Sequence, residues 1–274
     1  MLEKILEFKN LSFSYDENPF IEGLSIDISK GEFLMILGKN GSGKSTLLKL
    51  LFGIENKKSG EIIFKSRSIE DDIYFFRKSI SLVFQNPDEQ IICHTVEREL
   101  AFSMENYGIP KEEMGIRIDE VLNLVKLTEK RGSKIEELSG GEKQRLCIAS
   151  AMITKPDILV LDEPTSMLDS KNREVIIKLL ETINRQGVTI LIVSHHLKEL
   201  EYCNRVICLD NGSLTFNGET HEFIKNLLTN PEKYNLSLPT SFEFAVEIYR
   251  VYGIDISLEI FSFEKAGEKI WQSL

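Results

Sequence analysis

The chain has 274 residues and a net charge of −10, with 42% hydrophobic and 28% charged residues. Such a length and composition are ordinary for a globular protein with one large domain, alone or with a smaller appendage. The acidic balance disfavours DNA or RNA as the main partner, because phosphate backbones attract Lys and Arg. The N-terminus has no signal-peptide pattern, and no uncharged apolar run reaches the roughly 18 residues of a membrane span.

Strands come first in the predicted order of elements. Residues 5–15 and 24–28 alternate apolar and polar side chains, which is typical of half-buried strands. Residues 33–37 form a continuous apolar run, as expected for a strand buried on both faces. A Gly-rich loop and a helical pattern at 46–52 follow directly. This part of the chain is therefore predicted to be strand, loop and helix.

The middle of the chain changes from strand to helix. Residues 60–64 and 80–84 have the composition of further strands. From about 88 to 153 the apolar spacing becomes helical, with Thr95 and Ser139 as predicted N-caps. We interpret this stretch as a helical subdomain inserted into the main domain.

Strands and helices then alternate. The predicted strands are 158–162, 189–193 and 205–209, and the predicted helices lie near 170–186 and 196–203. Asp210-Asn211-Gly212 predicts a tight turn between two strands. Alternating strands and helices predict an α/β fold with a parallel sheet covered by helices on both faces.

The alternating pattern stops after about residue 220. We therefore predict a main domain over 1–230 and a C-terminal extension over 231–274, with two short amphipathic segments. The first segment carries an apolar stripe at helical spacing, made of Phe242, Ala245, Val246 and Tyr249.

The four cysteines form no Cys-x-x-Cys pair. We expect small buried thiols in a reducing compartment, and not a metal or disulfide site. They are Cys93, Cys147, Cys203 and Cys208.

Residues 38–45 read GKNGSGKS and fit the phosphate-loop pattern G-x-x-x-x-G-K-S. Glycines let the backbone bend so that successive N–H groups point at phosphate, and the helix that follows adds its N-terminal dipole. The pattern predicts that Lys44 reaches the β- and γ-phosphates, that Ser45 binds Mg²⁺, and that Thr46 donates near the α-phosphate. The predicted nucleotide-binding residues of the loop are Gly38, Asn40, Gly41, Ser42, Gly43, Lys44, Ser45 and Thr46.

The strand at 158–162 ends in two carboxylates. Asp162 is expected at the ligand-binding edge of a parallel sheet, where it would hold Mg²⁺ directly or through water. Glu163 is the candidate that orients or deprotonates an attacking water. The alternative is a pair of ordinary surface carboxylates at a strand end.

Residues 138–145 read LSGGEKQR and offer a second anion site. A serine and two glycines at a predicted helix start leave backbone amides open to phosphate. The alternative is a capped helix start with glycines for close packing. The candidate residues are Ser139, Gly140, Gly141 and Glu142.

Over roughly residues 3–230 the chain resembles the nucleotide-binding subunit of an ABC transporter, because the LSGGE-KQR run is similar to that family's signature and accompanies a phosphate loop. The resemblance implies a P-loop NTPase fold of the ABC type, with an antiparallel β subdomain and the inserted helical subdomain. It also implies ATP and Mg²⁺ as ligands and ATP hydrolysis as the activity.

Four further residues take their expected roles from this resemblance. Tyr15 matches the aromatic residue that stacks on adenine, and Gln85 matches the glutamine that couples Mg²⁺ and water to the transmembrane partner. Asp169 belongs to a segment similar to the family's S-x-L-D loop at the dimer interface, although it could also cap the next helix. His195 matches the switch histidine that contacts the γ-phosphate. His196 departs from the family pattern and receives no role.

The resemblance also implies partners. Two such chains would close head-to-tail around two ATP molecules, so that the signature of one faces the phosphate loop of the other. The sequence leaves open whether the second chain is identical or related.

Residues 84–91 and 95–110 resemble the energy-coupling-factor group. That likeness implies uptake of vitamins or of cobalt or nickel ions, with a transmembrane coupling protein and a substrate-binding membrane subunit, at the cytoplasmic face of the membrane. Asp88 and Glu89 would suit Arg-rich coupling helices, or form only a solvated loop. Residues 231–274 would help two ATPase subunits dimerise, or pack on their own domain. The transported substrate is not written in this chain.

Three alternatives remain at this point. One is the ATPase of another ABC importer class, and another is a soluble ABC-type clamp on DNA or ribosomes. The third is a nucleotide-binding regulator without turnover, which the presence of both Glu163 and His195 disfavours. Clamps carry long coiled coils or two such domains, which this sequence lacks, and the acidic charge also argues against nucleic acid.

Overall fold

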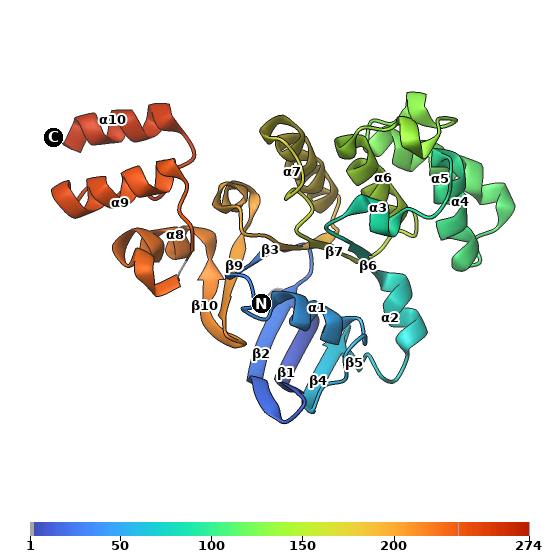
Figure 1. The fold of residues 1–274 in the computed structure, drawn as a ribbon, viewed down its shortest axis with the longest axis horizontal. Helices are drawn as coiled ribbons and strands as arrows, with labels where there is room; N and C mark the ends of the chain where they lie inside the picture. The colour runs from blue at the N-terminus through green and yellow to red at the C-terminus, as the bar shows by residue number, and fades with distance from the viewer. Residues whose placement is uncertain (1–2, 235, 274) are drawn as a thin grey trace. The chain divides into compact units, whose positions relative to one another are not determined.

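The computed structural model describes residues 3–234 and 236–273, and the chain divides into two compact units. The first unit takes the residues up to 9, then 25–33 and 61–193. The second unit takes 10–24, 34–60 and 194–274. Figure 1 labels the helices and strands in chain order.

A four-stranded sheet has the strand order β2-β1-β4-β5. Its strands are β1 (Lys4–Tyr15), β2 (Asn18–Ser29), β4 (Ser59–Phe64) and β5 (Arg67–Ser68), and α2 (Ile73–Ser79) follows. β4 and β5 run antiparallel, with Ile63 opposite Ser68. The predicted strands at 5–15 and 60–64 are confirmed, and the strand predicted at 24–28 is longer than expected.

Three parallel strands of the first unit lie in the order β8-β7-β6. They are β6 (Ile80–Val83), β7 (Ile158–Asp162) and β8 (Thr189–Val193). β8 is fully buried and β7 is buried up to its last residue, which explains the continuous apolar runs that predicted both strands. Because the strands are parallel, their carboxyl ends lie at one edge. Gln85 and Asp162 therefore belong to the same edge.

The helical stretch predicted from about 88 to 153 is confirmed. It holds α3 (Pro87–Gln90), α4 (Val96–Asn106), α5 (Lys111–Leu124) and α6 (Gly140–Met152), with 3-10 turns at Thr128–Lys130 and Ile135–Glu137. Figure 1 shows these helices gathered in green. Ser139 caps α6 through its side chain, whereas Thr95 occupies the N-cap of α4 without a capping hydrogen bond. The cap predicted at Thr95 is therefore confirmed only in position.

The second unit contains a three-strand arrangement in the order β10-β9-β3. Its elements are β3 (Phe33–Leu37), α1 (Lys44–Leu51), β9 (Arg205–Asp210) and β10 (Ser213–Glu219). β3 runs parallel to β9, and β9 runs antiparallel to β10. The predicted tight turn joins β9 and β10, with Asn211 and Gly212 at φ values of 46° and 75°.

Two predictions about this unit need correction. The helix expected near 196–203 is a 3-10 helix, η3 (Leu197–Tyr202). The regular pattern also continues beyond residue 220, because α8 (Thr220–Thr229) follows β10 directly. Four apolar side chains bury one face of α8: Phe223, Ile224, Leu227 and Leu228.

After the 3-10 turn η4 (Pro231–Tyr234), the C-terminal helices are α9 (Thr240–Tyr252) and α10 (Phe263–Ser273). α9 packs against α8, and its predicted stripe is buried at Phe242, Ala245 and Val246 and half-buried at Tyr249. The stripe therefore packs within its own chain, one of the two outcomes left open. Trp271 on α10, in contrast, is 83% exposed.

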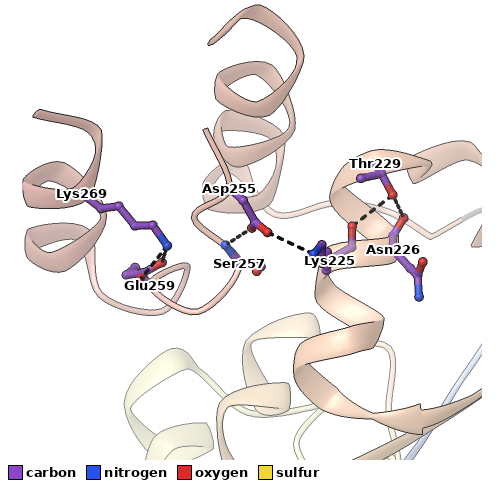
Figure 2. Close-up of polar contacts among 7 residues, drawn as sticks. All are labelled: Lys225, Asn226, Thr229, Asp255, Ser257, Glu259 and Lys269. Carbon is purple, nitrogen blue, oxygen red and sulfur yellow. Dashed lines mark hydrogen bonds and ion pairs between the residues drawn. The ribbon is translucent and has the colours of Figure 1, made fainter. Parts of the chain in front are cut away.

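Polar contacts tie the segments around these helices together (Figure 2). Lys225 of α8 lies 4.0 Å from Asp255, whose carboxylate accepts a hydrogen bond from the Ser257 amide at 2.9 Å. Lys269 of α10 pairs with Glu259 at 3.1 Å. The loop between α9 and α10 is thus held at both ends.

All four cysteines are free thiols; Cys147, Cys203 and Cys208 are buried, as expected, whereas Cys93 is only half-buried. Burial, with Glu99 as a further cause, raises the pKa of Cys147 to about 12.

Within residues 3–234 and 236–273 there is no helix with the length and apolar character that crossing a bilayer would need.

Candidate nucleotide site

The phosphate loop of the second unit connects β3 to α1. Gly41 and Gly43 have φ values of 80° and 110°, a region that side chains strongly disfavour, so these two turns require glycine. The Ser42 amide donates to the Lys39 carbonyl at 3.1 Å, which closes the loop. Ser45 and Asn40 are exposed beside it.

Lys44 is the buried cation of this loop. Its side chain folds back so that Nζ donates to the Gly38 carbonyl at 2.7 Å and to the Lys39 carbonyl at 3.0 Å. The residue is only 6% exposed. An ammonium has three N–H donors, so the group that tightens the loop is also suited to donate to a phosphate oxygen.

The loop is closely packed around a polar interior. Ser42 is fully buried, and among the described residues its Oγ has no hydrogen-bond partner. A side chain at Gly38 would place Cβ 2.3 Å from that Oγ. A buried hydroxyl in a narrow cradle of glycines fits a loop that wraps the oxygens of a phosphate chain.

The turn between β9 and β10 contacts the phosphate loop and holds it in place. The Gly212 amide donates to the Ser42 carbonyl at 2.9 Å, and Lys39 Nζ lies 3.4 Å from Asp210. A Cβ on Gly212 would lie 1.7 Å from the Phe20 carbonyl oxygen, so only glycine fits. Sequence reasoning predicted this turn as a strand connection and missed its contact with the phosphate loop.

Tyr15 lies against the start of α1. Its hydroxyl is 2.8 Å from Thr46 Oγ1, and its ring packs against Phe13 and Phe20 with centroid distances of 4.8 and 5.5 Å. The residue is 44% exposed, so part of its ring faces solvent. An exposed aromatic face next to a phosphate loop can stack on a planar base.

In the first unit, β7 ends with Asp162, which is half-buried. Glu163 follows with φ at 45°, a left-handed conformation that costs a non-glycine residue roughly 1–2 kcal/mol. Its amide donates to the Val193 carbonyl at 2.9 Å, which holds this conformation. The predicted roles of Asp162 and Glu163 toward Mg²⁺ and water stay predictions.

Gln85 and Glu163 are brought together. Gln85 Nε2 donates to Glu163 Oε2 at 3.3 Å and to Ser166 Oγ at 3.1 Å. Ser166 Oγ in turn donates to the Glu163 carbonyl at 3.0 Å. Sequence analysis assigned no role to Ser166, so its place in this cluster is a finding of the structure.

The signature segment begins α6 with a capping box. Ser139 Oγ accepts from the Glu142 amide at 3.3 Å, and Glu142 Oε2 accepts from the Ser139 amide at 2.8 Å. The hydrogen bond from the Ser139 amide lowers the pKa of Glu142 below its usual value, although desolvation of the carboxylate opposes this shift. Gly140 is exposed, so the capped helix start keeps an open backbone at its tip.

Asp169 caps α7 (Ser170–Arg185), the alternative that the sequence left open. Its carboxylate accepts from the backbone and side-chain nitrogens of Asn172, each at 2.8 Å, and these bonds lower its pKa. A Cβ on Gly141 would lie 2.6 Å from Asn172 Oδ1. Gly141 therefore permits close packing of α6 on α7 within one chain, and its predicted contact with nucleotide stays a prediction.

His195 is exposed just after β8, with its ring centroid 4.2 Å from that of His196. The His196 amide donates to Ser194 Oγ at 3.0 Å, which fixes the start of η3. His195 thus follows the end of β8 in the sequence, and its predicted contact with the γ-phosphate stays a prediction.

Comparison with known proteins identifies the family. Residues 21–166 match the family described as ABC transporter. The chain is 37% identical to the energy-coupling factor transporter ATP-binding protein EcfA1 of Streptococcus mutans, and the match covers 99% of this chain and 98% of that protein. It is 39% identical to EcfA1 of Oceanobacillus iheyensis, with the same coverage. The chain belongs to the ABC transporter ATP-binding family.

Solved structures support the fold of this ABC protein. CbiO1 from Clostridium perfringens, described as part of the ABC transporter complex cbiONQ, superposes with a TM-score of 0.76 at 31% identity and covers 85% of this chain and 98% of that one. The ATP-binding cassette MJ1267, in its ADP conformation, gives a TM-score of 0.74 at 27% identity, over 85% and 97% of the two chains. The predicted ABC-type P-loop fold and the resemblance to the energy-coupling-factor group are confirmed.

Proposed function

We propose that this chain binds ATP with Mg²⁺, hydrolyses it, and thereby energises a membrane importer of the energy-coupling-factor kind, for vitamins or for cobalt or nickel ions. The observation that carries the proposal is the buried Lys44 ammonium, held by carbonyls of a glycine loop that fits phosphate. Similarity to energy-coupling-factor ATP-binding proteins over nearly the whole chain supports the importer.

Each candidate residue has a part in this proposal. The amides from Gly38 to Thr46 and the Lys44 ammonium bind the phosphates, and Tyr15 stacks on adenine. Bound Mg²⁺ would neutralise charge on the phosphates, and Ser45, Gln85 and Asp162 would hold it.

The remaining groups act on the water and on a second chain. Glu163, oriented by Gln85, orients or deprotonates the attacking water, and His195 contacts the γ-phosphate. Ser139, Gly140, Gly141 and Glu142 read the nucleotide of a second, identical or related chain in a head-to-tail dimer, with Asp169 at the interface. Capped helix starts and open amides suit that anion.

The partners follow from the same proposal. A transmembrane coupling protein and a substrate-binding membrane subunit hold the chain at the cytoplasmic face of the membrane, with no nucleic acid involved. We keep the division into an ATPase domain over 1–230 and an extension over 231–274 as part of this proposal.

Phosphate release by the full chain, purified with the proteins it binds from detergent-solubilised membranes, tests the proposal. We expect turnover only with Mg²⁺, and a fall of about 100-fold or more in Glu163→Gln, because general-base groups contribute about 10²–10⁴-fold. Glu174→Gln, which alters a carboxylate paired with Lys178 on α7, serves as the matched control and should keep full activity.

Two results would contradict the proposal. Normal turnover by Glu163→Gln would remove its assigned role, and recovery of ribosomes or DNA in place of a small membrane protein would refute the importer.

A further inference from the structure

An ion pair joins the signature helix to the segment that follows Gln85. Lys143 Nζ of α6 lies 2.7 Å from Asp88 Oδ1 of α3. One turn further along α6, the buried Cys147 places Sγ 4.0 Å from the Pro87 carbonyl. The short helix α3 therefore rests on one face of α6.

At its α6 end, the pair is tied to the signature serine. The Lys143 amide donates to the Ser139 carbonyl at 2.9 Å, so Lys143 belongs to the first turn that Ser139 caps. A displacement of Lys143 would therefore displace the capped helix start.

At its α3 end, the pair is tied to the glutamine. The Asp88 amide donates to Asn86 Oδ1 at 3.1 Å, and Asn86 directly follows Gln85. Gln90 accepts from the Phe84 amide at 2.9 Å, which closes the segment on the other side of Gln85. Gln85 itself donates to Glu163 at 3.3 Å. A continuous set of contacts thus runs from Ser139 to Glu163.

We propose that Asp88 and Lys143 are positioning residues for ATP hydrolysis: their ion pair sets the place of Gln85 and Glu163 relative to the signature serine of the same chain. This inference rests on the proposed function. Displacing a reacting group by about 1 Å can cost 10²-fold in rate, so a link between two such groups matters more for turnover than for stability. Exposed ion pairs contribute little to stability.

Steady-state ATP turnover of the full chain, purified with its membrane partners, tests the inference. Asp88→Asn and Lys143→Met should each lower kcat about tenfold, with the KM for ATP within about twofold. The charge swap Asp88→Lys with Lys143→Asp should recover most of kcat. Thermal unfolding should shift by less than about 4 °C.

The control breaks a similar pair elsewhere in the first unit. Arg117 and Glu113 on α5 lie 2.9 Å apart, with side chains 23% and 52% exposed, against 21% for Lys143 and 65% for Asp88. Glu113→Gln should leave kcat unchanged.

Unchanged kcat in both single variants, no recovery in the swap, or an equal loss in Glu113→Gln would each overturn the inference. Absence of turnover in the unaltered protein is a different result, since it removes the proposed function itself.

Discussion

Two lysines of the phosphate loop have different partners. Lys44 is 6% exposed and bonds to loop carbonyls, whereas the Lys39 side chain is 39% exposed and pairs with Asp210. A triphosphate offers charged oxygens to which a buried ammonium such as that of Lys44 can donate hydrogen bonds. Of these two lysines, Lys44 is therefore the one suited to bind phosphate.

Replacing Lys44 by Ala should lower ATP affinity about 10- to 100-fold, because a hydrogen bond to a charged group contributes about 1.5–3 kcal/mol. Titration calorimetry measures the effect. Lys39→Ala is the matched control, which should stay within about threefold of the unaltered protein. Equal affinity for Lys44→Ala and the unaltered protein would rule out its phosphate role.

Sequence reasoning predicted Gln85 and Glu163 as separate site residues but gave no sign of their hydrogen bond. It also could not place Ser166 between them. The reason lies in the φ of 45° at Glu163, since no residue type marks a left-handed position that is not glycine or asparagine. The motif residues can be identified from their order along the chain. Their contacts, however, depend on local reversals of the backbone such as the one at Glu163.

At the scale of elements, the turn between β9 and β10 serves both the sheet and the phosphate loop. Its Gly212 amide supports the Ser42 carbonyl, and its Asp210 pairs with Lys39. The loop therefore depends on a segment about 170 positions later in the sequence, a distance at which local patterns carry no information.

Gly212→Ala should destabilise the chain by about 1–3 kcal/mol and weaken ATP binding, because Cβ would collide with the Phe20 carbonyl oxygen at 1.7 Å. Gly53→Ala is the control. Its φ is 66°, but a Cβ there has no heavy atom within 4 Å, so it should cost about 1 kcal/mol and leave ATP binding intact. Urea unfolding and calorimetry compare the two, and equal losses would argue against the support described here.

The strands that were easiest to predict are buried on both faces, because apolar runs such as 33–37 and 189–193 are too short for a typical helix. The elements that were misjudged lie later. Within 197–202 the apolar pair Leu197 and Leu200 has i, i+3 spacing, which both a 3-10 helix and an α-helix place on one face, so the pattern did not distinguish the two. α8 was missed although its apolar spacing is regular, because the predicted alternation of strands and helices ended at about residue 220.

For the whole molecule, we propose that a complete nucleotide site forms only when two chains pair, because each chain supplies part of the candidate residues. The signature tip at Gly140 is exposed and capped, which suits contact with a second copy or a related chain. The C-terminal stripe of α9 is already covered by its own chain, so it does not by itself supply that contact.

Glu163→Gln with ATP should elute from gel filtration as a dimer, since slow hydrolysis leaves the bound nucleotide to hold two chains together. Without ATP it should elute as the smaller species. Adding Lys44→Ala to the same chain should abolish the ATP-dependent shift. A shift that persists in this double variant would separate association from nucleotide binding.

Trp271 is the one tryptophan of the sequence and stands 83% exposed on α10. Indole emission moves to shorter wavelength when the ring leaves water, so the unlabelled protein carries its own optical reporter at the C-terminus. Fluorescence recorded before and after assembly would tell whether a partner covers this helix.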